Sequence, residues 1–253
     1  MKQGEALFIT GTDTGIGKTM VTGCLQALFA AAGYRSIPYK PVQSGGVRQG
    51  EQLVAEDVAF YRSVSSLPYE QEMLCTYCME PAVSPHLAAR QTGTRIEWER
   101  IETHLAMLRG EHDIVLVEGA GGLAVPLAET ESGLYMTTDL VQRLRLPLLL
   151  VTHPELGTIN HTVLTAAYAK QLGIPVLGLI VNQMPEHATD MQQDNVKVMK
   201  ELTGLPVLGT LPPFRQAELE GLRTSQTALE GYIDIKQLVR RLQQVKETQP
   251  QTN

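Results

Sequence analysis

A glycine-rich segment between an apolar run and a helical pattern constrains this chain more than any other feature. Residues 6–9 are the apolar run Ala-Leu-Phe-Ile, and residues 11–19 read Gly-Thr-Asp-Thr-Gly-Ile-Gly-Lys-Thr. The order predicts a strand, a tight loop and a helix, because glycine permits the turn and lets backbone N–H groups converge on phosphate oxygens. The dipole of the helix adds positive charge at its amino terminus. The segment therefore predicts a phosphate-binding loop.

Two side chains at the end of this loop have predicted roles in nucleotide binding. Lys18 can reach the β- and γ-phosphates of a nucleotide, and the hydroxyl of Thr19 can bind Mg²⁺. A glycine-rich turn without a ligand is the alternative, but Gly-Lys-Thr between a buried strand and a helix makes it unfavourable. Five residues separate Gly11 from Gly17, one more than in the standard pattern. The loop is therefore a variant, which is typical of a subfamily.

The size and charge of the chain narrow the classes of protein to consider. With 253 residues, of which 43% are hydrophobic, it can build a full core without disulfide or metal support. We expect one domain over residues 1–253, with the polar tail 243–253 frayed, because no linker or shift in composition divides the sequence. The net charge of −6 argues against a nucleic-acid-binding protein.

The cysteines and the hydropathy of the chain predict the cellular compartment of the protein. The longest apolar run, residues 146–151, contains a proline and is far too short to span a membrane. Cys75 and Cys78 have a redox or zinc spacing, but no second pair accompanies them, so we interpret residues 75–78 as a short strand. Three cysteines without a disulfide framework suit a reducing compartment. We expect a cytoplasmic protein with no signal peptide and no membrane or nucleic-acid partner.

Short apolar runs alternate with longer helical patterns along the chain. The runs predict strands at residues 5–10, 35–40, 113–118, 147–152, 175–181 and 206–210. The helical patterns follow the loop as far as Gly33 and then cover residues 53–63, 85–92, 96–109, 136–145, 158–172, 188–203 and 233–246. This alternation predicts an α/β fold: a doubly wound, mostly parallel sheet flanked by helices, as in P-loop nucleoside triphosphatases. Ligands of such sheets bind at the carboxyl ends of the strands.

Three charged side chains at or near predicted strand ends are candidates for phosphate chemistry. Lys40 would lie at the tip of the second strand, where a cation stabilises a transferring phosphoryl group. Asp57 and Glu118 are candidate Mg²⁺ ligands, and Glu118 stands directly before the glycine-rich residues 119–122. Each also has an ordinary interpretation. Lys40 could be a solvated surface lysine, Asp57 a first-turn helix acid and Glu118 part of a plain strand-to-turn segment.

Further polar residues follow the later strands. Gly157 can close a turn and Thr158 can cap a helix, while Asn160 and His161 could merely decorate that helix. Residues 182–183 are Asn-Gln at the end of a predicted strand, where an asparagine can bind adenine or simply serve a turn. Residues 211–214, Leu-Pro-Pro-Phe, could wall a base pocket or terminate the last strand.

Taken together, five segments resemble the dethiobiotin synthetase family. They are residues 11–19, 39–45 (Tyr-Lys-Pro-Val-Gln-Ser-Gly), 84–86 (Ser-Pro-His), 117–122 (Val-Glu-Gly-Ala-Gly-Gly) and 157–161 (Gly-Thr-Ile-Asn-His). The resemblance extends from Gly11 to about Phe214, and the longer loop fits this family. It implies an ATP-dependent ring closure of 7,8-diaminononanoate with CO₂, which yields dethiobiotin, ADP and phosphate through a carbamate and a carbamic-phosphoric anhydride. ATP would be the co-substrate and Mg²⁺ the cofactor.

The resemblance also implies roles for particular residues. Lys18 and Lys40 would be catalytic, and Thr19, Asp57 and Glu118 would hold the metal. ATP would be bound by Gly15, Ile16, Gly17, Lys18, Thr19, Met20, Asp57, Glu118, Gly119, Ala120, Gly121, Asn182, Gln183, Pro212 and Pro213. The substrate would be bound by Thr14, Ser44, Gly157, Thr158, Ile159 and Asn160. In this family the active site lies at a homodimer interface, so residues 157–160 would reach the substrate of the facing subunit.

One departure and two alternatives accompany the resemblance. Some members of the family have glutamate where this chain has Gly15, so contacts with metal or nucleotide could differ. A cobyrinate-type amide synthetase shares the loop and its core, but it usually adds a glutaminase domain. A partner-switching partitioning ATPase generally has a lysine early in the loop, where this chain has Thr12 and Asp13. No role is assigned to His86, His153 or His161.

Overall fold

A seven-stranded parallel sheet forms the centre of the protein. The computed structural model describes residues 3–65, 67–131, 133–214, 229 and 231–248. The strand order is β11-β10-β9-β1-β6-β2-β5, and every pairing between neighbours is parallel. The strands are β1 (Glu5–Gly11), β2 (Ser36–Ser44), β5 (Cys75–Met79), β6 (Ile114–Gly122), β9 (Leu148–Thr152), β10 (Val176–Val181) and β11 (Val207–Thr210).

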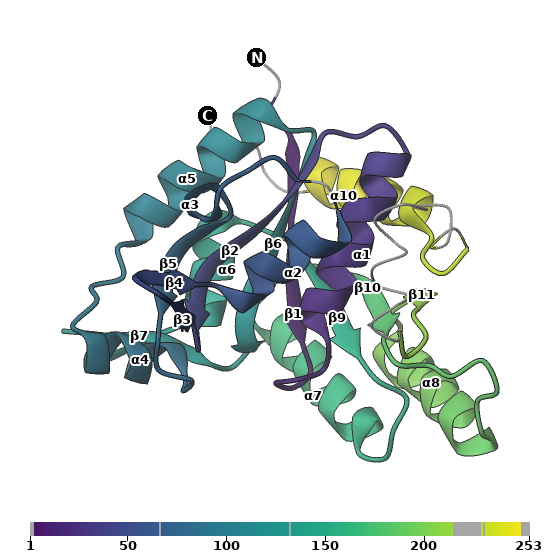
Figure 1. Ribbon diagram of the computed structural model, residues 1–253. Coiled ribbons are helices and arrows are strands. Elements are labelled where there is room, and N and C mark those ends of the chain that lie inside the picture. Colours follow the sequence, from purple (N-terminus) through teal and green to yellow (C-terminus); the bar gives the residue numbers. More distant parts are fainter. Residues whose placement is uncertain (1–2, 66, 132, 215–228, 230, 249–253) are drawn as a thin grey trace.

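Helices lie on both faces of this sheet, which confirms the predicted doubly wound α/β architecture (Figure 1). They include α1 (Lys18–Ala31), α2 (Glu56–Val64), α3 (Gln71–Leu74), α4 (Pro85–Thr92), α5 (Trp98–Glu111), α6 (Thr137–Leu144), α7 (Thr158–Gln171), α8 (Asp190–Thr203) and α10 (Ile235–Thr248). Two antiparallel hairpins pair β3 (Val47–Gln49) with β4 (Gln52–Val54) and β7 (Pro126–Thr130) with β8 (Gly133–Met136). Among the described residues, no helix has both the length and the apolar character needed to cross a membrane.

The sheet separates two apolar clusters, which explains why its strands read as continuous apolar runs. In β1, Ala6 and Phe8 face the cluster that contains residues of α5, α6 and α7. Leu7 and Ile9 face the opposite cluster, which contains residues of α1 and α10. Successive side chains of a strand point to opposite faces, so a strand that is covered on both sides needs apolar residues at every position.

The six predicted strands are all present, and residues 75–79 form a seventh strand as expected. The main difference in the helices concerns α2, which begins at Glu56 rather than at residue 53. Leu53 instead belongs to β4. The side chain of Gln71 holds this segment extended, because it donates to the Leu53 carbonyl oxygen and accepts from the Ala55 N–H group. The two hairpins and α3 were not predicted from the sequence.

Two strands run beyond their predicted ends. β2 continues through Ser44, and its last residues pair with β5, where Lys40 lies opposite Cys75. β6 continues to Gly122, which pairs with Gly11 of β1. Lys40 and Glu118 therefore lie inside strands and not at strand tips. Neighbouring strands, which the local pattern does not reveal, supply the pairing that extends them.

The carboxyl-terminal helix extends farther than expected. The predicted fraying of residues 243–253 does not begin at residue 243, because α10 continues to Thr248. Val245 packs against the cluster that contains α1, and Lys246 forms an ion pair with Glu5 at 2.6 Å. These contacts hold the last turns of the helix against the sheet. Residues 249–253 lie outside the described residues.

The chain reverses its direction of winding at β1. After β1 the chain crosses to β2 on one side, whereas β9 pairs with the other edge of β1. β1 thus lies between β6 and β9, and its carboxyl end leads into the glycine-rich loop. Open α/β sheets bind ligands at such a switch point, so the fold places the loop where a ligand is expected.

Adjacent residues of α5 allow a matched test of this packing. Leu108 is fully buried, whereas Met107 on the same helix is 42% exposed. Leu108→Ala should lower the free energy of unfolding by about 2–5 kcal/mol, because it removes buried methyl groups and leaves a cavity. Met107→Ala should change it by less than about 1 kcal/mol. Urea unfolding of both variants checks this, and equal losses would contradict the assigned burial of this helix.

Candidate active site

The glycine-rich loop has a conformation that only glycine adopts easily. Gly15 and Gly17 have positive φ angles of 73° and 91°. A Cβ atom on Gly17 would lie 1.9 Å from Nδ2 of Asn182, which itself donates to the Ile16 carbonyl oxygen at 3.0 Å. At Gly15, by contrast, a Cβ atom would meet no atom within 4 Å. Gly17 is thus required by both conformation and space, while Gly15 borders open volume.

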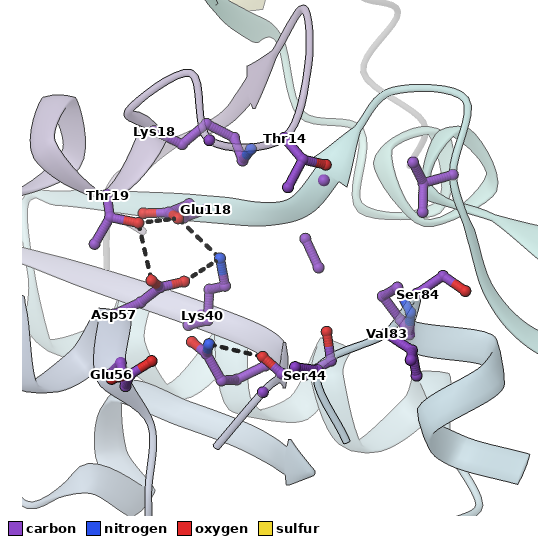
Figure 2. A pocket seen from close by; sticks show the side chains of 18 of the residues that line it. Thr14, Lys18, Thr19, Lys40, Ser44, Glu56, Asp57, Val83, Ser84 and Glu118 are labelled. Carbon is purple, nitrogen blue, oxygen red and sulfur yellow. Dashed lines mark hydrogen bonds and ion pairs between the residues drawn. The ribbon is translucent and has the colours of Figure 1, made fainter. Parts of the chain in front are cut away.

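Lys18 begins α1 and its side chain turns back along the loop. It is 7% exposed, and its Nζ donates to the Asp13 carbonyl oxygen at 3.3 Å. Burial lowers the pKa of Lys18, and the nearby charge of Lys40 lowers it further, against smaller opposing effects of Glu118 and Asp57. Figure 2 shows Lys18 and Thr14 on one side of a cleft, with Lys40 and Ser44 on the other. A desolvated ammonium beside the loop is well suited to bind phosphate oxygens.

Lys40 lies at the centre of a buried cluster of charges. Its Nζ is 2.6 Å from Oδ2 of Asp57 and 2.8 Å from Oε1 of Glu118, and it donates to the Gly119 carbonyl oxygen at 3.0 Å. Burial by itself lowers the pKa of Lys40, but the charges of Glu118 and Asp57 and their hydrogen bonds together raise it above its ordinary value. The side chain is therefore a charged, fully paired ammonium and not a surface lysine.

Thr19 joins the same two carboxylates from the opposite direction. Its hydroxyl lies 2.9 Å from Oδ1 of Asp57 and 3.0 Å from Oε1 of Glu118. Burial raises the pKa of Asp57, but Lys40 and the Thr19 hydrogen bond lower it more, so the net shift is downward. Asp57 is therefore ionised at neutral pH.

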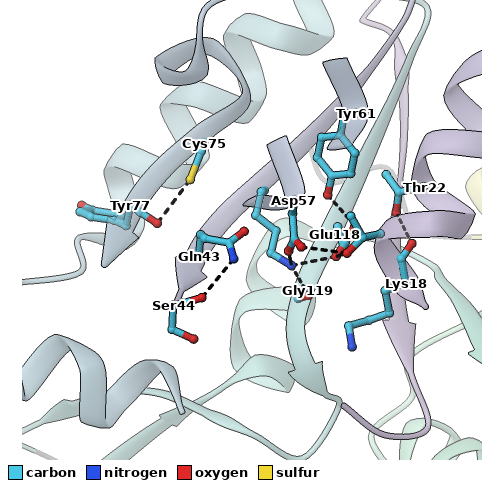
Figure 3. A network of polar contacts seen from close by, with 12 residues as sticks. Lys18, Thr22, Gln43, Ser44, Asp57, Tyr61, Cys75, Tyr77, Glu118 and Gly119 are labelled. Carbon is cyan, nitrogen blue, oxygen red and sulfur yellow. Dashed lines mark hydrogen bonds and ion pairs between the residues drawn. The ribbon is translucent and has the colours of Figure 1, made fainter. Parts of the chain in front are cut away.

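Tyr61 contacts the other oxygen of Glu118. Its hydroxyl donates to Oε2, as Figure 3 shows. Glu118 is 1% exposed, and it accepts hydrogen bonds from Tyr61, Thr19 and Lys40. Burial raises the pKa of Tyr61 well above its ordinary value, and the negative charges of Glu118 and Asp57 raise it further. The phenol therefore stays protonated and acts as a donor. The sequence alone gave no role to Tyr61.

The donor set of this cluster fits Mg²⁺. Asp57 and Glu118 offer two carboxylates, each within hydrogen-bonding distance of the Thr19 hydroxyl. The ammonium of Lys40 already shows that a cation is favourable beside these oxygens. Among the described residues, His, Cys, Asp and Glu form no group of three or more that could hold a metal by themselves. The set therefore suits an ion that takes a few hard protein oxygens and completes its shell with phosphate and water.

A cleft of about 710 Å³ opens beside the cluster. Of the residues predicted for the site, those that line it are Thr14, Gly15, Gly17, Lys18, Thr19, Lys40, Ser44, Asp57, Glu118, Ala120 and Gly121. The remaining lining includes residues to which sequence reasoning gave no role, among them Gln43, Glu56, Ala82, Val83 and Val125. Their neighbours offered the available signal, because Gln43 precedes Ser44, Glu56 precedes Asp57 and Val83 precedes the Ser-Pro-His segment.

The residues predicted to bind the adenine base do not line this cleft. Asn182 and Gln183 follow β10, and Pro212 and Pro213 follow β11, at the same edge of the sheet as the loop. Asn182 is 3% exposed and contacts the loop through the Ile16 carbonyl oxygen. Met20, which was predicted to bind ATP, is partly buried and packs against the apolar cluster that contains residues of α1.

The segment at the start of α7 divides into buried and exposed side chains. Thr158 is fully buried, and its hydroxyl hydrogen-bonds that of Thr152 at 2.8 Å, so its side chain serves the fold. Ile159 is half-buried, whereas Gly157 and Asn160 are exposed. None of these four residues lines the cleft within their own chain.

Comparison with solved structures shows the fold. A chain of the MinC:MinD cell division protein complex of Aquifex aeolicus superimposes with a TM-score of 0.56, covering 98% of both chains at 13% identity. A ParA family ATPase from Chlorobium tepidum gives a TM-score of 0.54 at 14% identity and covers 95% of this chain and 98% of its own. At these identities the likeness supports the P-loop fold alone.

Sequence comparison shows the family. Residues 5–220 match the family described as AAA domain. ATP-dependent dethiobiotin synthetase BioD of Anoxybacillus flavithermus is 41% identical over 82% of this chain and 91% of its own length. The enzyme of the same name from Geobacillus kaustophilus is 44% identical over 87% of this chain and 91% of its own. The chain belongs to the dethiobiotin synthetase family.

Proposed function

We propose that this protein uses ATP to close the ureido ring of dethiobiotin from 7,8-diaminononanoate and CO₂, releasing ADP and phosphate. The observation that carries the proposal is the convergence of Lys18, Lys40, Thr19, Asp57 and Glu118 on one cleft. Phosphoryl transfer depends on positioning and on stabilising negative charge, and this set of residues supplies both.

The chemistry has three steps that the cleft must accommodate. One amine of the substrate adds to CO₂ and loses a proton, which gives a carbamate. A carbamate oxygen attacks the γ-phosphorus of ATP, ADP leaves and a carbamic-phosphoric anhydride results. The second amine then attacks the carbonyl carbon and loses a proton, and phosphate leaves as the ring closes. The phosphate is needed because an oxide ion is a poor leaving group.

The two lysines would supply positive charge from opposite sides of the cleft. Lys18 would bind the β- and γ-phosphates, and Lys40 would stabilise the carbamate and the phosphoryl group during transfer. Thr19, Asp57 and Glu118 would hold Mg²⁺. When bound there, Mg²⁺ would neutralise part of the negative charge of the phosphates. Because Lys40 bridges the buried Glu118 and the half-buried Asp57, its ammonium is held in place before any ligand arrives.

The substrates would occupy different parts of the site. Thr14 and Ser44 would contact the diamine or the carbamate, beside the apolar Val83 and Val125. Adenine would lie over the residues that follow β10 and β11, namely Asn182, Gln183, Pro212 and Pro213. Because Nδ2 of Asn182 donates to the Ile16 carbonyl oxygen, the carbonyl Oδ1 is the atom that would accept from adenine. The loop residues Gly15, Ile16, Gly17 and Met20 and the strand-end residues Gly119, Ala120 and Gly121 would surround the phosphates.

A homodimer with the active site at its interface is part of this proposal. Leu156 and Leu164 are 85% and 59% exposed, and Asn160 lies between them in the sequence. Asn160 and Leu164 are four apart and share one face of α7, and Leu156 lies in the turn just before the helix, so an exposed, half-apolar surface surrounds Asn160 that a second copy would cover. Gly157, Thr158, Ile159 and Asn160 would then approach the substrate of the partner, Thr158 through its backbone.

We also propose that the chain forms one domain and that the protein is cytoplasmic. One domain over the whole chain is supported by the central seven-stranded sheet, whose strands come from residues between 5 and 210. The cytoplasmic location stays a prediction.

The partner-switching alternative has the shared fold in its favour. At 13% identity, however, that likeness says nothing of activity, whereas relatives at 41–44% identity are synthetases. Thr12 and Asp13 also stand where partitioning ATPases generally have lysine. We therefore favour ring closure.

The first prediction concerns the requirement for all three substrates. Phosphate release from ATP should require both 7,8-diaminononanoate and bicarbonate, because the carbamate is the nucleophile. A coupled phosphate assay with each component omitted in turn checks this. Vigorous turnover with ATP alone would reject the synthetase and favour a switching ATPase.

The second prediction concerns Lys40. Lys40→Met should lower kcat at least about a hundredfold, because a preorganised charge is lost. It should also lower the free energy of unfolding by about 3–5 kcal/mol at neutral pH, because the buried Glu118 and the half-buried Asp57 lose their cation. Phosphate assays and urea unfolding measure the two effects.

The stability deficit of Lys40→Met should shrink as the pH falls. In the wild type, the folded-state pKa of Asp57 is lowered from its ordinary value of 3.8. Asp57 therefore contributes its full stabilisation above pH 3.8, and this contribution is lost as the pH falls through the folded-state pKa. In the variant, protonation instead relieves the unpaired charges. A deficit that stays constant toward pH 3.8 would contradict this charge pairing. Lys197→Met, at an exposed position, is the control and should change stability by less than about 1 kcal/mol.

The third prediction tests the shared active site by mixing two variants. Asn160→Ala should raise KM for the diamine about tenfold and leave KM for ATP unchanged. Lys40→Met and Asn160→Ala protomers, mixed after unfolding, should regain activity at low diamine concentration. A mixed dimer has one site with both residues intact, so random assembly should restore about a quarter of wild-type activity.

The outcome separates two arrangements. If Lys40 and Asn160 act within one protomer, the mixture has no more activity than the average of its two components, and the cross-interface role is rejected. Lys170→Ala, at an exposed position near the other end of α7, is the matched control for Asn160→Ala and should leave both KM values unchanged.

A further inference from the structure

Tyr61 has an arrangement that its place in the apolar core does not require. Its ring is fully buried on the inner face of α2 with Val58 and Val64. Its hydroxyl reaches Oε2 of Glu118, the oxygen opposite the one that Lys40 and Thr19 contact. Each oxygen of this buried carboxylate therefore has its own donors, and Tyr61 bonds the oxygen on the far side from the cation.

The same helix face carries a candidate metal ligand. Asp57 and Tyr61 are four residues apart on α2, so their side chains project from neighbouring positions on one face. Asp57 approaches Thr19 and Lys40, and Tyr61 approaches Glu118. One short helix thus positions one carboxylate directly and the other through a hydrogen bond.

From this geometry we propose that Tyr61 is a positioning residue, which fixes the orientation of Glu118 so that Oε1 faces Thr19 and the Mg²⁺ site. The inference rests on the proposed function, which assigns the metal to Thr19, Asp57 and Glu118. Residues that hydrogen-bond a metal ligand restrict its orientation, and their loss typically lowers metal affinity about 10–100-fold. Tyr61 touches neither substrate nor metal in this proposal and acts only through Glu118.

The test compares two buried tyrosines that differ in their hydroxyl partner. Tyr39 is also fully buried in the same apolar cluster, but its hydroxyl contacts Thr76 and not Glu118. Tyr61→Phe and Tyr39→Phe each remove one buried hydroxyl and keep the ring. Calorimetry of the full chain would measure binding of a non-hydrolysable ATP analogue with and without Mg²⁺.

Tyr61→Phe should lower the affinity for Mg²⁺ in the presence of the analogue by about tenfold or more. Metal-free binding of the analogue should stay as in the wild type, because Tyr61 does not contact the phosphate loop. Tyr39→Phe should leave both affinities unchanged, whatever its effect on Tm. Unchanged Mg²⁺ affinity in Tyr61→Phe, or an equal loss in Tyr39→Phe, would overturn the inference.

Two further outcomes are distinguishable. If the wild type binds the analogue equally with and without Mg²⁺, the assigned metal role fails, and the inference fails with it. If Tyr61→Phe does not fold, Tyr61→Gln and Tyr61→Leu provide a second pair, because the glutamine amide can donate to Glu118 and leucine cannot. The inference then requires tighter Mg²⁺ binding in the glutamine variant, and equal binding would reject it.

Discussion

The buried ion pairs of Lys40 are the interaction on which the arrangement of the site depends. Lys40 comes from β2, Asp57 from α2 and Glu118 from β6, so one ammonium holds three separate elements together. Placing charges away from water is costly unless each is paired and hydrogen-bonded, and here the buried Lys40 and Glu118 and the half-buried Asp57 all have such partners. The cluster therefore favours one relative position of these elements.

The sheet makes this clustering possible. Parallel pairing of β1, β2 and β6 brings their carboxyl halves to one edge, beside the loop that leads into α1. Layers on both faces keep water away from Lys40 and Glu118, so their mutual attraction is weakly screened. The pairing that stabilises the fold is thus the same pairing that assembles the charges proposed for phosphoryl transfer.

The sequence predicted the framework well because its signals are local. Apolar runs marked the strands, and glycine with Lys18 and Thr19 marked the loop. It placed Lys40 and Glu118 at strand tips, whereas both lie inside longer strands. That error has a physical cause, because the last residues of β2 are extended by pairing with β5, a partner some 35 residues farther along the chain. The hairpins were missed because their strands are short, with three to five residues each.

The sequence by itself determined the order along the chain of the seven strands of the central sheet and of the helices other than α3, the phosphate-binding loop and the resemblance that comparison with relatives confirmed. Only the tertiary structure decided that Lys40 is a buried, doubly paired cation, that Thr158 serves the fold, and that Tyr61 bonds the second oxygen of Glu118. Local spacing fixes which residues share a helix face or a loop. Burial, charge pairing and hydrogen bonding between distant segments depend on how the sheet brings those segments together, and a pattern of neighbouring residues does not contain that information.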